Sequence, residues 1–85
     1  LEINISVTLV SDVKDSVHDE IESAIYDYLS DVALNKAYVS YAKIGSLILA
    51  ISGVEDYSDL TVNNETSNIQ LNDGVIPVLG SVVIS

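Results

Sequence analysis

His18, the only histidine of this 85-residue sequence, is the side chain best suited to acid–base chemistry near neutral pH. A histidine base that supports nucleophilic catalysis needs a cysteine or serine beside it, held there by a recognisable motif. The sequence contains no cysteine, and no such motif places a serine beside His18. We therefore interpret His18 as a surface histidine and predict no catalytic residue.

A group of carboxylate and amide side chains in the second half of the chain offers the hard oxygen ligands that calcium prefers. It consists of Glu55, Asp56, Asp59, Asn63, Asn64 and Glu65. An EF-hand loop needs such ligands at alternating positions, with a central glycine and a late glutamate, and this spacing is absent. A solvated, charged strand edge is the simpler interpretation. We predict no metal site and no cofactor.

The hydrophobic pattern assigns these side chains to secondary-structure elements. Residues 1–9 alternate between apolar and polar side chains, which predicts a strand with one buried face. Residues 13–32 carry apolar side chains at helical spacing, and a second helix is predicted from Tyr41, capped by Ser40, to Gly53. A glycine just past the last apolar position is where a left-handed residue usually ends a helix.

Three further strands are predicted at residues 54–62, 68–71 and 75–84, with turns between them. Pro77 and Gly80 make the last one an edge strand with a bulge. The order β-α-α-β-β-β predicts an α+β fold, a two-layer sandwich with both helices on one face of a small mixed sheet. The order of the strands in the sheet stays open. Residues 1–85 are predicted to form a single domain.

Composition excludes several classes of partner. Thirteen acidic residues against three lysines give a net charge of −10, which repels nucleic acids and anionic lipids. No apolar run approaches the ~20 residues that a membrane span requires. The chain begins at Leu1, without an initiator methionine and already within a strand pattern, so we expect it to be a piece of a longer protein.

The first helix carries a candidate contact face. The residues of this face follow one another at spacings of three and four, with Tyr26 almost opposite the apolar stripe. They are Asp15, Asp19, Glu22, Tyr26 and Ser30. Like-charged pairs such as Asp15 and Asp19 cost about 0.2–0.5 kcal/mol each. A tyrosine among uncompensated carboxylates suits a basic protein partner. The alternative is a solvated helix face with one exposed aromatic residue.

The second helix offers another candidate, because Ala42, Gly45 and Leu49 form a small apolar facet away from its main stripe. A helix that is apolar on two sides is buried on two sides. The second side would pack either against the first helix or against a neighbouring subunit.

Three segments of the second half carry a family resemblance: an aromatic-valine entry, a glycine-led strand start and a late Val-Leu-Gly. They are residues 38–41, residues 53–63 with the core Gly-Val-Glu-Asp-Tyr, and residues 76–82, and a short helix predicted at residues 44–51 lies between the first two. With these motifs the chain resembles the C-terminal domain of baseplate J-like proteins, which belong to contractile phage tails and PBSX-type prophage elements.

The resemblance implies a structural protein of the virion tail baseplate, assembled in the bacterial host cytoplasm, and not an enzyme. Its implied partners are other baseplate subunits, with further copies of itself in the full-length assembly, and no nucleic acid, membrane or small-molecule substrate. The candidate contact residues are Asp15, Asp19, Glu22, Tyr26 and Leu49. A free-standing acidic binding module for a metal, a small ligand or a cationic peptide is the alternative function.

Overall fold

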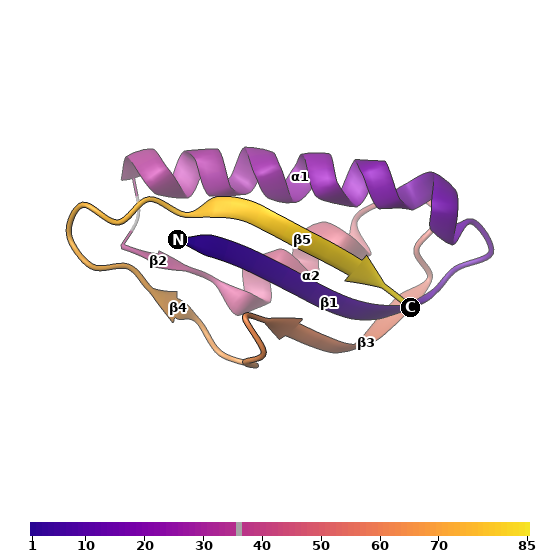
Figure 1. The fold of residues 1–85 in the computed structure, drawn as a ribbon. Helices are drawn as coiled ribbons and strands as arrows, with labels where there is room; N and C mark the ends of the chain where they lie inside the picture. Colours follow the sequence, from indigo (N-terminus) through magenta and orange to yellow (C-terminus); the bar gives the residue numbers. More distant parts are fainter. Residues whose placement is uncertain (36) are drawn as a thin grey trace.

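The protein, described here by a computed structural model of residues 1–35 and 37–85, contains two helices and five strands within those residues (Figure 1). The elements are β1 (Glu2–Val10), α1 (Lys14–Asn35), β2 (Tyr38–Val39), α2 (Tyr41–Leu49), β3 (Asp56–Val62), β4 (Ile69–Gln70) and β5 (Val78–Ile84). The α+β class predicted from the sequence is confirmed. Strand β2 was not predicted, since two residues are too few to show a period. Lys36 lies outside the described residues.

The main sheet has three strands in the order β3-β1-β5, which settles the strand order that the sequence left open. Strand β1 is antiparallel to β3 and parallel to β5, so the sheet is mixed, as predicted. Burial alternates strictly along its apolar residues. Ile3, Ile5, Val7 and Leu9 are each at most 3% exposed, and the side chains between them face away from the core. The helices therefore cover one face of the sheet.

Helix α1 lies along β5 and α2 packs on β3, so each helix covers one side of the central strand (Figure 1). The stripe of α1 that enters the core is fully apolar. It consists of Val17, Ile21, Ile25, Leu29 and Val32, each at most 2% exposed. This stripe is the one that the helical spacing predicts. The helix continues to Asn35, three residues beyond the predicted end.

Helix α2 begins as predicted, because Ser40 accepts a hydrogen bond from the backbone N–H of Lys43 at 3.1 Å. Its predicted end at Gly53 is wrong, since the helix stops at Leu49 with Ala50 as C-cap. Gly53 does adopt a positive φ of 100°, and it lies against Val13. The glycine therefore serves the turn after the helix and the approach to the start of α1.

Both edge strands of the main sheet contain a bulge. In β3 the pairing with β1 shifts between Thr61 and Ser58, around Asp59, whose φ is +53°. In β5 it shifts between Leu79 and Val82, which confirms the bulge predicted around Gly80. Bulges of this kind bend an edge and disturb its ladder of backbone groups, which discourages edge-to-edge pairing.

A small second sheet and a tight turn complete the fold. Strand β4 pairs with β2, with Tyr38 opposite Gln70, so the predicted strand at residues 68–71 joins this sheet and not the main one. The turn predicted after β3 is confirmed: Asn63 and Asn64 both have positive φ, as a two-residue hairpin turn requires.

Candidate protein-contact site

The carboxylates and the tyrosine predicted on the first helix share one side of α1, and that side lies beside β5. The side chain of Asp19 is 96% exposed, Tyr26 is 61% exposed, and Glu22 is partly covered. Tyr26 was expected almost opposite the core stripe. It instead lines a groove together with Leu79 of β5, because the start of β5 lies beside this side of the helix.

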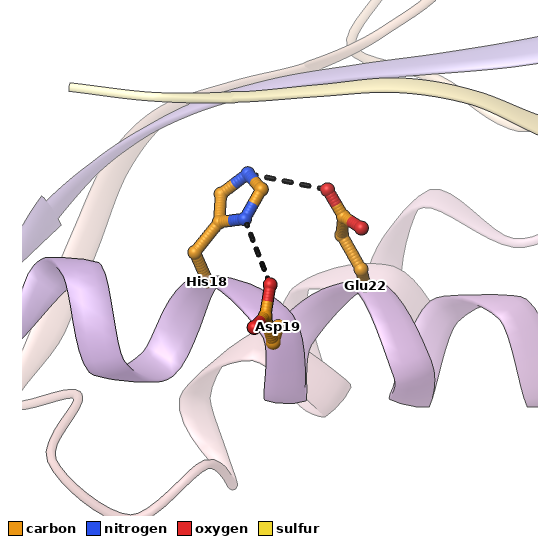
Figure 2. Close-up of side chains that lie close together, drawn as sticks. All are labelled: His18, Asp19 and Glu22. Atoms are coloured by element: carbon orange, nitrogen blue, oxygen red, sulfur yellow. Dashed lines mark ion pairs between the residues drawn. The ribbon is translucent and has the colours of Figure 1, made fainter.

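His18 connects the acidic side of α1 to β5. Figure 2 shows its ring between the side chains of Asp19 and Glu22. Its Nε2 lies 3.2 Å from the carbonyl oxygen of Val82 and 3.3 Å from Oε1 of Glu22, and its Nδ1 lies 3.6 Å from Oδ1 of Asp19. A carbonyl only accepts hydrogen bonds, so Nε2 carries the proton that it donates to Val82. Nδ1 then approaches Asp19 favourably only when the ring is the doubly protonated cation.

This arrangement raises the pKa of His18 above its ordinary value. The hydrogen bond to the Val82 carbonyl is the main cause, and the charges of Glu22 and Asp19 add to it against a partial desolvation that lowers the pKa. The protonated ring is therefore favoured in the folded protein. His18, interpreted from the sequence as an ordinary surface residue, links a helix to an edge strand.

Among residues 1–35 and 37–85, His18, Asp19 and Glu22 form the group whose side chains could hold a cation, with their ligand atoms within 4.8 Å of one another. The two carboxylates approach different ring nitrogens. A cation bound at Nε2 would displace the proton donated to Val82 and would leave Asp19 on the other side of the ring. The geometry favours the imidazolium ion over a metal centre.

Two adjoining hollows form a groove along the seam between α1 and β5. One, of about 250 Å³, is lined by Tyr26, Leu29, Ser30 and Ala33 of α1 and by residues 76–79. The other, of about 350 Å³, is lined by Asp19, Glu22, Ser23, Tyr26 and Leu79. Since both include Tyr26 and Leu79, we treat them as one groove, called the seam groove below. It is apolar at one end and acidic at the other.

Strand β3 covers one part of the apolar facet predicted on α2 and leaves another part exposed. A side chain on Gly45 would collide with the hydroxyl of Tyr57, so β3 covers this position, and not the first helix as one alternative had it. Leu49 remains 48% exposed, beside a shallow hollow that it shares with Tyr57. The structure therefore places Leu49 on a different surface from Asp15, Asp19, Glu22 and Tyr26.

Sequence reasoning missed the contribution of β5 to the site. Val82 acts through its main-chain carbonyl, which any residue type supplies, and Leu79 lies more than 50 positions from Tyr26 in the sequence. The sequence did offer one signal of the contact between His18 and Glu22. Glu22 follows His18 by four residues, a spacing that brings two side chains together on a helix.

Comparison with known proteins adds the family. The chain matches the model of the baseplate J-like protein C-terminal domain over residues 1–85. It is 28% identical to the phage-like element PBSX protein XkdT of Bacillus subtilis strain 168, over 98% of this chain and 25% of that protein. It is 29% identical to the uncharacterised protein YqbT of the same strain, with the same coverage.

The chain spans about a quarter of the length of these two relatives. No helix that the structure describes is long and apolar enough to cross a membrane. With the family model matched from the first residue to the last, and a fold of the class that the motifs imply, the chain belongs to the family of baseplate J-like protein C-terminal domains.

Proposed function

We propose that this domain is a structural component of a phage or prophage tail baseplate, where it binds other baseplate proteins and catalyses no reaction. The family match over the whole chain is the observation that carries the proposal. An acidic contact surface supports it, since Asp15, Asp19 and Tyr26 are exposed on one side of α1. Glu22 belongs to the same surface, and Leu49 is the candidate contact on α2.

The proposal extends to the setting of the domain. Because the relatives are about four times as long as this chain, we infer that it is the C-terminal part of a longer baseplate protein. The baseplate J-like family supports a place in the tail baseplate, and one relative is named as a protein of a phage-like element. Assembly in the bacterial host cytoplasm is part of the same proposal. Several copies of the full-length protein would form a closed ring or wedge.

The test uses tail particles produced from a prophage or phage that encodes the full-length protein. Particles from the intact gene are compared by electron microscopy and mass spectrometry with particles from a gene that lacks residues 1–85. We expect the intact particles to contain the domain and the deletion to stop baseplate assembly. Complete, contractile particles without the domain would contradict the proposal.

A second candidate function is an acidic binding module for a metal, a small ligand or a cationic peptide. The observation in its favour is the closeness of the ligand atoms of His18, Asp19 and Glu22. Melting of the domain is followed with Zn²⁺, with Ca²⁺ and with a lysine-rich peptide. A rise in melting temperature with one metal that His18→Gln abolishes supports a metal-binding module. The assembly function predicts no such rise.

A further inference from the structure

We propose that the seam groove is the docking site for a segment of another protein that carries a lysine followed by apolar side chains. The inference rests on the proposed assembly function and names the chemistry of the partner. The seam groove places two kinds of surface in a row, with Asp19 and Glu22 at one end and Ile76 and Val78 at the other. Tyr26 lies where the two hollows meet.

The apolar end exposes surface that the fold itself leaves uncovered. Tyr26 is 61% exposed, Ile76 58% and Val78 49%, around the partly buried Leu79. These side chains come from α1, from the start of β5 and from the residues just before β5, and they line one hollow. An exposed aromatic residue within an apolar hollow is the usual anchor point of a protein interface.

The acidic end determines the charge of the partner. Asp19 and Glu22 line it, and none of the described lining residues is basic. His18 beside them, even when protonated, offsets the charge of only one of these two carboxylates. A net charge of −10 over the whole chain extends the attraction for a basic segment beyond the seam groove.

A second copy of the chain fits this surface poorly, because it brings 13 acidic residues and only three lysines. Addition of a partner strand to the edge of β5 is also disfavoured. Pro77 has no N–H to donate, the pairing shifts around Gly80, and the Val82 carbonyl is bonded to His18. The partner therefore contributes side chains to the seam groove and not a continuous backbone ladder.

Carboxylate chemistry in assembled tail particles tests the docking. A carbodiimide joins a carboxylate directly to a lysine amine in contact with it, and glycine ethyl ester labels those carboxylates that stay open to solvent. We expect Asp19 or Glu22 to be joined to a lysine of a different baseplate protein and to be shielded from the ester. Glu20 and Asp27 are the matched controls, since they are exposed on α1 and line neither hollow, about 80–100° around its axis from Asp19 and about 140–160° from Glu22.

The partner protein identified by this coupling is then titrated with the full-length protein at low salt. We expect Tyr26→Ala and the double variant Asp19→Asn/Glu22→Gln each to bind about tenfold more weakly. The double variant Glu20→Gln/Asp27→Asn, which loses the same charge from the same helix, should bind as the wild type does. Circular dichroism confirms that each variant is folded.

The outcomes separate the two proposals. Particles that contain the domain but leave Asp19 and Glu22 as open to the ester as Glu20 and Asp27 would overturn the docking site alone. Coupling only to lysines of this chain would also overturn it. Particles that lack the chain altogether would overturn the assembly function and the docking site together.

Discussion

The backbone carbonyl of Val82 on β5 accepts a hydrogen bond from the imidazole of His18 on α1, across 3.2 Å and 64 positions of sequence. Backbone groups alternate in direction along a strand, and Ser85 directs both of its groups to β1. The carbonyl of Ile84 therefore points to the open edge, and so does that of Val82. His18 thus satisfies a group that the ladder leaves unpaired.

This contact predicts how stability depends on pH. The pKa of His18 is raised in the folded state, so its contribution is fully present below the unfolded value of about 6.5 and is lost as pH rises through the folded pKa. We expect His18→Gln to be less stable than the wild type at pH 6, with the gap shrinking towards pH 9. Urea unfolding across this range measures the gap. A gap that widens as the pH rises would show that the neutral imidazole, and not the protonated one, stabilises the fold.

Gly53 predicts a backbone effect. Alanine there must adopt a φ of +100° and brings its Cβ to 2.8 Å from Cγ2 of Val13. We expect Gly53→Ala to lower the free energy of unfolding by about 1–3 kcal/mol. Gly74→Ala is the control, because Gly74 has a φ of +80° but open space around it. A loss from Gly53→Ala no larger than the control's would mean that contact with Val13 does not matter.

The hydrogen bonds that Asn4 accepts predict how much its side chain stabilises the bulge of β5. Its Oδ1 accepts from the backbone N–H of Ser81 at 2.9 Å and from the Ser81 hydroxyl at 3.2 Å. We expect Asn4→Ala to cost about 0.5–1.5 kcal/mol and to speed amide exchange at Ser81. Asn4→Asp keeps the acceptor and should retain the slow exchange. Equal exchange rates in both variants would argue against this bond.

The burial of Ile25 predicts how much stability is lost when a core side chain is shortened. Its side chain is fully buried in the centre of the α1 stripe. We expect Ile25→Val to cost about 0.5–1.5 kcal/mol, because it removes one methylene group and leaves a small cavity. Leu34→Ala, on the same helix but 84% exposed, should change stability by less than about 0.5 kcal/mol. Denaturant titration measures the free energy of unfolding of both variants. Equal losses would mean that Ile25 is not a core residue.

Periodicity in the sequence predicted the parts of the fold that obey a local rule. Ile3, Ile5 and Val7 face the core because strand side chains alternate, and Ile21 and Ile25 do so because helical side chains recur every turn. The turn at Asn63 and the bulge at Gly80 followed from residue type. Each of these is determined within a few positions of the chain.

Relationships between distant segments could not be predicted in this way. The placement of β1 between β3 and β5 depends on how all the apolar faces are covered together. Tyr26 was assigned to the correct helix but to the wrong surroundings, because the position of β5 was unknown. The contact of Gly45 with Tyr57 likewise joins two elements, α2 and β3, whose relative placement cannot be read from the periodicity of either one.

The parallel pairing of β1 with β5 also determines how the domain resists force. The two strands are neighbours and run in the same direction, so Leu1 and Ser85 lie towards opposite ends of their ladder (Figure 1). A pull applied between these two residues draws β1 and β5 past each other lengthwise and loads their hydrogen bonds together instead of peeling them apart one by one. In this geometry the domain behaves as a mechanical clamp along its long axis.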